Sequence, residues 1–208
     1  MAYPQVSAPY GFQPLNRVDG MPYAGATKLL PIEAAVSTPI FNGDVVAYAL
    51  GGIVKSGVTT DSTTSAANYT FGVFVGCQYV NSLGQTVQAQ YFPGYSTAVT
   101  NAYAYVVVDP MAEFKVAVTT SASAIIATTA NAIGTNVAVV QGTGNTVTGD
   151  SGQSVLQPVA GSGSAAALPF RVVEVVPATA TGTNAFVELV VKLNNPQIVG
   201  AAEAFNFA

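Results

Sequence analysis

Hydrophobic residues alternate with polar or small residues in several short runs of the chain, which is the period-two pattern of β-strands. Within the stretch Gly72–Phe92, the residues Val73, Val75, Cys77 and Tyr79 fall on one face of such a strand. The same alternation of apolar and polar residues resumes after a polar turn that ends in a glycine. We therefore expect an antiparallel hairpin with its apolar face buried.

Comparable runs predict strands elsewhere, each bounded by glycine, proline, asparagine or aspartate. Two further hairpins are expected, Val45–Leu50 with Ile53–Lys55 and Arg171–Val176 with Phe186–Leu193. Other strands are expected at Thr27–Ile32, Tyr103–Val108, Phe114–Val118 and Val137–Val140. Because Tyr103–Val108 is almost wholly apolar, both of its faces should be covered. Residues 56–68 and 142–152 are expected to be loops, and residues 123–132 a short helix in spite of their β-branched side chains.

The first 26 residues have a different character, because they combine four prolines with several aromatic residues. Proline fixes an extended backbone and removes a hydrogen-bond donor, so this segment predicts an extended arm. The predicted fold is all-β, an antiparallel β-sandwich or barrel with an extended N-terminal arm and few or short helices. The predicted organisation is an arm at residues 1–26, a single β-rich domain at residues 27–195, and a C-terminal tail at residues 196–208.

Charge changes the picture, because only 8% of the 208 residues are charged, whereas 50% are hydrophobic. An ordinary soluble domain has about 25% charged residues. No apolar run reaches the roughly 18 residues of a spanning helix, so a membrane is not expected as a partner. The net charge is −4, and the six cations are scattered, which argues against binding nucleic acid. A surface with so few charges favours a protein that partners cover.

Candidate catalytic chemistry is sparse. The chain has no histidine, which removes imidazole bases and imidazole metal ligands. The single cysteine, Cys77, falls on an apolar strand face and is interpreted as a buried core residue. The sequence contains two pairs of carboxylates, Asp109 with Glu113 and Glu174 with Glu188. We interpret them as surface partners of nearby cations, namely Lys115, Arg171 and Lys192. We therefore expect no enzyme activity, no cofactor, no metal site and no small-molecule substrate.

The order of the segments resembles one family, the cement or head-decoration proteins of marine and freshwater tailed phages, including phages of cyanobacteria. The stretches that carry the resemblance run in order along nearly the whole chain, and each is a combination of strand and turn. They are Pro9–Ile32, Phe41–Gly57, Phe71–Val80, Gln88–Tyr95, Tyr105–Val116, Ile133–Leu156, Leu168–Val176 and Leu189–Asn195.

The resemblance implies a structural virion protein on the outer surface of the phage head, made in the host cytoplasm. It implies the major capsid protein and further copies of the chain, as a homotrimer, as partners. The proline-rich arm and the tail are then the expected contacts, because aromatic anchors are enriched at interfaces. The candidate interface residues are Tyr3, Tyr10, Phe12, Tyr23, Phe205 and Phe207. The alternatives are another virion component, such as a tail or fibre protein, and a β-sandwich module that binds glycans.

Overall fold

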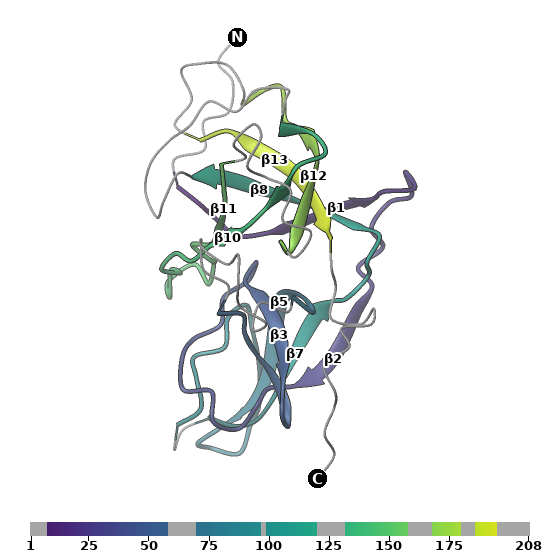
Figure 1. Ribbon diagram of the computed structural model, residues 1–208. Helices are drawn as coiled ribbons and strands as arrows, with labels where there is room; N and C mark the ends of the chain where they lie inside the picture. The colour runs from purple at the N-terminus through teal and green to yellow at the C-terminus, as the bar shows by residue number, and fades with distance from the viewer. Residues whose placement is uncertain are drawn as a thin grey trace.

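The computed structural model describes residues 8–57, 70–96, 99–119, 132–157, 168–179 and 186–194 of the chain. These residues form thirteen β-strands, and the described part contains no α-helix. The strands make two sheets that pack together, one above the other in Figure 1. The prediction of an all-β sandwich or barrel is therefore confirmed.

The lower sheet, here called the six-stranded lobe, has the strand order β2-β7-β5-β3-β4, with β6 paired to β5. A bridge between Ile32, just after β2, and Ile53 in β4 joins the two ends of this order. The sheet therefore curls into a nearly closed barrel, which leaves little unpaired strand edge. Its strands are β2 (Thr27–Pro31), β3 (Val45–Ala49), β4 (Gly52–Lys55), β5 (Gly72–Asn81), β6 (Thr86–Ala89) and β7 (Val99–Val107).

The upper sheet, here called the seven-stranded lobe, has the strand order β10-β11-β8-β13-β12-β9. The two ends of this order, β9 and β10, follow each other in the chain with only Ala138 between them, so this sheet also approaches a barrel. Strands β1 and β11 share one edge of β8, and the β11–β8 pair is parallel. The strands are β1 (Gln13–Arg17), β8 (Ala112–Thr119), β9 (Asn136–Val137), β10 (Val139–Val140), β11 (Ser154–Leu156), β12 (Phe170–Val175) and β13 (Glu188–Leu193).

Each lobe has its own hydrophobic core, and the two cores meet at the junction. Val45, Val73 and Val107 belong to strands β3, β5 and β7 of the six-stranded lobe, yet all three are buried in the core of the seven-stranded lobe. These residues therefore lie at the junction ends of their strands. The opposite ends of the same strands lie at the pole of the six-stranded lobe that is farthest from its neighbour (Figure 1).

The N-terminal segment lies between the lobes and then joins the upper sheet. Phe12 is fully buried and stacks on Phe170 with 4.4 Å between the ring centroids. The backbone N–H of Phe12 donates to the carbonyl of Gly43 at 2.9 Å, and that of Gly11 donates to the carbonyl of Gln153. Residues 13–17 are extended, as the arm prediction requires, but they pair with β8 of the same chain.

The three hairpins expected from the sequence are confirmed as the antiparallel pairs β3–β4, β5–β6 and β12–β13. The single-face arrangement expected for Val73, Val75, Cys77 and Tyr79 is wrong. A register shift between Phe74 and Gly76 divides the face, so that Val73 lies in the core of the upper lobe and Cys77 in that of the lower lobe. A β-bulge adds one residue and reverses the alternation beyond it.

Two other expectations are also corrected. Val137–Val140 forms two short strands rather than one, because β9 pairs with β12 whereas β10 pairs with β11. In β7, Tyr103 is 42% exposed, so the two faces of this strand are not both covered along its whole length. The short helix expected at residues 123–132 and most of the loop expected at residues 56–68 lie outside the described residues.

Candidate functional site

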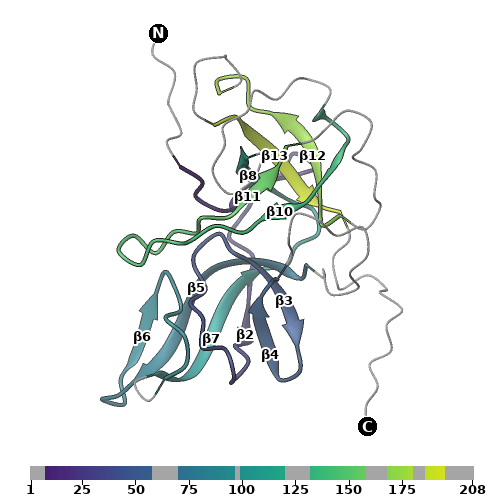
Figure 2. The ribbon, with the colours of Figure 1, turned by 60° about the vertical axis from the view of Figure 1, so that its left-hand side comes forward.

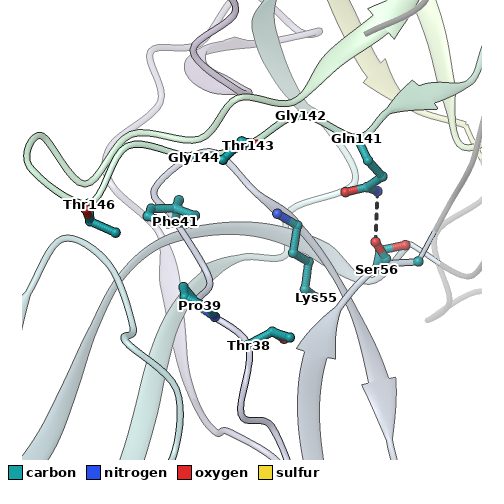
Figure 3. Close-up of a pocket in the computed structure, with 11 residues that line it drawn as sticks. Thr38, Pro39, Phe41, Lys55, Ser56, Gln141, Gly142, Thr143, Gly144 and Thr146 are labelled. Atoms are coloured by element: carbon teal, nitrogen blue, oxygen red, sulfur yellow. Dashed lines mark hydrogen bonds between the residues drawn. The ribbon is translucent and has the colours of Figure 1, made fainter.

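The candidate site is an open groove of about 670 Å³ at the junction of the two lobes. One wall is the segment before β3 together with the end of β4, and the other wall is the segment that follows β10 (Figure 3). This second segment, residues 141–151, extends from the seven-stranded lobe along the side of the six-stranded lobe (Figure 2). The residues that line the groove are Thr38, Pro39, Phe41, Lys55, Ser56, Gly57, Gln141, Gly142, Thr143, Gly144 and Thr146.

The charge of the groove comes from Lys55, whose ammonium group lies 3.0 Å from Oδ2 of Asp44. Asp44 is fully buried, and its carboxylate also accepts hydrogen bonds from the backbone N–H of Phe41 at 2.9 Å and from the Ser151 hydroxyl at 2.6 Å. A buried carboxylate is tolerated when it is paired and hydrogen-bonded in this way. Lys55 therefore contributes a neutralised cation to the groove.

A second series of hydrogen bonds involves Gln153, which is also fully buried. Its amide oxygen accepts from the backbone N–H of Val45 at 2.8 Å, and its amide nitrogen donates to Oε1 of Gln141 at 2.9 Å. Gln141 in turn donates to the carbonyl of Ser56 at 3.0 Å, the bond drawn in Figure 3. These bonds connect β3 and β4 of one lobe to the segment between β10 and β11 of the other. Their first role is to fix the two lobes together.

The groove carries hydrogen-bonding groups without a nucleophile–base pair among the described residues. The Ser56 hydroxyl is buried and has no hydrogen-bond partner in the described structure. The Asp44 carboxylate is already engaged by Lys55 and Ser151. Within the described residues, no group of three histidine, cysteine or acidic side chains is placed to hold a metal ion. The groove can therefore hydrogen-bond a ligand through threonine and glutamine side chains, and in the part of the chain that the structure describes no acid and base are arranged together in it.

A separate polar cluster lies where the N-terminal segment meets β8 and β13. The Tyr10 hydroxyl donates a hydrogen bond to Glu188, and the Lys115 ammonium lies 3.3 Å from the same carboxylate. Lys115 also lies over the Tyr10 ring, 5.6 Å from its centroid. Burial, and then the hydrogen bond and charge of Glu188, raise the pKa of Tyr10 far above its usual value. The cluster fastens the N-terminal segment to the body.

The structure places three of the six candidate interface residues. Tyr10 and Phe12 contact their own chain, as described above, and Tyr23 packs partly buried against the core of the seven-stranded lobe. Burial and the nearby Asp109 carboxylate raise the pKa of Tyr23. Tyr3, Phe205 and Phe207 lie outside the described residues. Tyr10, Phe12 and Tyr23 therefore lie in the same lobe, and the role of all six at an interface stays a prediction.

The carboxylates are paired differently from the sequence interpretation. Glu188 is only 5% exposed, and it pairs with Lys115 and Tyr10 rather than at the surface with Arg171 or Lys192. Asp109 pairs with Arg17, at 3.3 Å. Two long-range pairings are the cause. The pairing of β13 with β8 brings Glu188 close to Lys115, and the pairing of β1 with β8 brings the N-terminal segment, with Tyr10 and Arg17, against the same part of the body.

Cys77 is 1% exposed, which confirms that it is a buried core residue. Burial raises the pKa of its thiol to about 12. Because the thiolate is the reactive form, the Cys77 thiol has low reactivity in the folded protein.

Sequence reasoning missed Asp44 and Gln153, the two fully buried polar residues that organise the groove. Asp44 follows Asn42-Gly43, and this triplet is typical of a turn, which hides its role as a buried ion-pair partner. Gln153 lies in a glycine-rich and serine-rich stretch that is typical of a loop. No local signal distinguishes either residue from a solvent-exposed one.

Comparisons of the chain with protein-family models, with curated proteins and with solved structures found no match. Among the described residues, no helix is long and apolar enough to cross a membrane.

Proposed function

We propose that this protein is a structural virion protein, a cement or decoration protein that binds the outer face of a tailed-phage icosahedral capsid and stabilises the junctions between capsomers. The supporting observation is a surface that combines few charges with large exposed apolar side chains. Leu50 is 99% exposed, Val147 92% and Leu83 78%. Such side chains gain from burial against a partner, at about 25 cal/mol per Å² of apolar surface.

A repeated lattice makes this kind of surface effective, because the same weak contact is formed many times over. The ordered sequence resemblance to head-decoration proteins supports the same role. The proposed partners are the major capsid protein and other copies of the chain. The proposed contacts include the terminal segments that carry Tyr3, Phe205 and Phe207.

The test is a titration of the purified protein onto capsids that lack it, followed by sedimentation with and without a heat challenge. Saturable and near-stoichiometric binding that raises the temperature of head rupture is the expected result. Absence of binding to both empty and filled heads would contradict the cement role and favour a tail or fibre protein.

A test of the N-terminal contact requires a truncation that leaves the fold intact. Removing residues 1–15 would delete Phe12 and part of β1, so it would damage the upper core as well as the arm. A variant that begins at Ala8 removes Tyr3 and keeps the described structure. We expect this variant to retain its β circular-dichroism signal and to bind capsids more weakly. Unchanged capsid binding would exclude the first seven residues as a contact.

The groove at the lobe junction favours one other candidate function, a module that binds glycans through threonine and glutamine side chains. Phe41 is the aromatic residue of this groove, but it is only 6% exposed, and Gly144 lies against its ring. A glycan array separates the two candidates. Specific retention of a glycan that is lost in a Thr143→Val variant would favour the module.

A further inference from the structure

The sequence contains one Asn-Gly pair, Asn42-Gly43, in the segment that precedes β3. Asparagine is chemically labile, and a following glycine makes its deamidation easiest because no side chain hinders the glycine nitrogen. That nitrogen attacks the side-chain carbonyl carbon of the asparagine, ammonia leaves, and a cyclic succinimide remains. Water then opens the ring at either carbonyl, which gives aspartate or isoaspartate. Water is the only other reactant, so the conformation of the pair decides whether the reaction proceeds.

The four backbone polar groups of this pair are all hydrogen-bonded in the folded protein. The N–H of Asn42 donates to the carbonyl of Gly149 at 3.0 Å, and the carbonyl of Asn42 accepts from the N–H of Ser151 at 2.9 Å. The attacking atom, the nitrogen of Gly43, donates its hydrogen to the carbonyl of Phe74 at 2.8 Å. Attack requires this nitrogen to lose its hydrogen and to rotate toward the Asn42 side chain. These bonds must therefore break before the reaction can begin.

Close packing is a second restraint on the pair. Gly43 has a φ of +90°, and its carbonyl accepts a hydrogen bond from the N–H of Phe12 at 2.9 Å. A Cβ at Gly43 would lie 2.9 Å from the nitrogen of Phe12 and 3.1 Å from Cα of Gly11. The pair thus lies where the N-terminal segment, β5 and residues 141–151 meet, at the junction of the two lobes. It cannot rotate while this junction is closed.

We propose that Asn42 is a deamidation site gated by the lobe junction: the closed junction protects Asn42, and opening of the junction exposes it to the reaction. A group that reacts only in a locally open state reacts more slowly in proportion to the free energy of opening. Deamidation of Asn42 therefore records how often the two lobes separate. This inference does not depend on the virion role.

The reaction also prevents the junction from closing again. Isoaspartate adds a carbon atom to the main chain between the nitrogens of residues 42 and 43, so the bonds to Gly149 and Phe74 cannot both form again in the same register. Either product places a new carboxylate near Asp150, because Asn42 and Asp150 form a β-bridge, and like charges repel. Opening of the junction is thus reversible before the reaction and irreversible after it.

The test places a second Asn-Gly pair in an exposed turn of the same chain. Asp19→Asn does this, because Gly20 follows with a φ of +80° and a Cβ at Gly20 would meet nothing within 4 Å. The full-length variant is aged in mildly alkaline buffer, and peptide mass spectrometry follows deamidation at positions 19 and 42. In the folded protein we expect position 19 to react at least about tenfold faster than Asn42, and in concentrated urea we expect similar rates.

Two results of this comparison would overturn the inference. Equal rates in the folded protein would show that the closed junction does not protect Asn42. A slow reaction of Asn42 in urea as well would assign its protection to the neighbouring sequence rather than to the fold.

The gate is tested with Gln153→Ala, which removes the side chain that joins Val45 to Gln141 across the junction. Gln88→Ala, at an exposed position of β6, is the matched control. We expect Gln153→Ala to raise the rate at Asn42 at least about threefold, and Gln88→Ala to leave it unchanged. If Gln153→Ala does not fold, the wild type in urea below its unfolding transition gives the same readout, and the rate should rise with urea. An unchanged rate in either experiment would contradict the gate.

The irreversible step has its own readout. Asp19→Asn chains aged in urea are returned to buffer, and hydrogen–deuterium exchange follows the backbone amides of Phe12 and Ser151. Unreacted chains, and chains deamidated only at position 19, should regain protection of both amides. Chains with isoaspartate at position 42 should not regain it, because the junction stays open. Full protection in those chains would show that the junction closes in spite of the modification and would refute this step.

Discussion

At the scale of single residues, two aromatic side chains proposed for an interface serve the fold of their own chain. Phe12 stacks on Phe170 inside the upper core, and the Tyr10 hydroxyl donates a hydrogen bond to Glu188, which is paired with Lys115. Proline spacing and aromatic content indicate an extended segment, but they do not reveal what that segment contacts. An extended strand binds equally well to a neighbouring subunit and to an edge of its own sheet.

Substitution of Phe12 by alanine tests its structural role. We expect Phe12→Ala to lower the free energy of unfolding by about 3–5 kcal/mol, since it leaves a cavity where a fully buried ring was. Urea denaturation followed by circular dichroism measures this change. Leu15→Ala on the neighbouring strand, with a side chain 38% exposed, is the control and should cost far less. Equal costs would contradict the placement of Phe12.

The Tyr10 hydroxyl predicts a stability change at high pH. In the unfolded chain Tyr10 ionises near pH 10, whereas burial and Glu188 raise its pKa in the folded protein. Above pH 10 the folded state then binds more protons than the unfolded state, so stability falls as pH rises. We expect Tyr10→Phe to remove this contribution, which is at most about 1.4 kcal/mol per pH unit. Parallel stability curves for wild type and variant between about pH 9 and 11.5 would refute it.

At the scale of elements, the hairpins were predictable and the long-range pairings were not. Glycine turns and alternating residues identified the hairpins β3–β4, β5–β6 and β12–β13. The pairing of β1 with β8 joins residues about a hundred positions apart, and no local pattern encodes it. The groove arises from such pairings, so the sequence did not predict Asp44 or Gln153 as its organising residues. The bulge near Gly76 was missed for a related reason, because alternation continues through it in the sequence.

A pair of glycines tests the path of the N-terminal segment between the lobes. Gly11 and Gly20 both have φ near +80°, so alanine imposes the same backbone strain at each. A Cβ at Gly11 would lie 2.6 Å from Cβ of Ser151 and 2.7 Å from the carbonyl oxygen of Gly43, whereas one at Gly20 would meet nothing within 4 Å.

We therefore expect Gly11→Ala to lower the melting temperature clearly more than Gly20→Ala, which should cost only about 1 kcal/mol of strain. Differential scanning fluorimetry of the two variants at equal concentration gives the comparison. If both variants melted together, the close passage of the segment beside Gly43 and Ser151 would be wrong.

At the scale of the whole molecule, the two lobes have different surfaces. The seven-stranded lobe carries ion pairs such as Arg17–Asp109 and Lys115–Glu188, which are compatible with water. The six-stranded lobe carries exposed leucines and tyrosines, such as Leu50, Leu83 and Tyr103. The low overall charge is visible in the composition, but which large apolar side chains remain exposed depends on the turns and sheet faces that carry them.

The most direct test of this account is hydrogen–deuterium exchange of the protein alone and in the presence of capsids that lack it, read peptide by peptide. We expect backbone amides around the Leu50 and Leu83 turns to gain protection when capsids are present, because a partner then covers these exposed side chains. Unchanged exchange at both turns would contradict the claim that this protein meets a partner through its exposed apolar side chains.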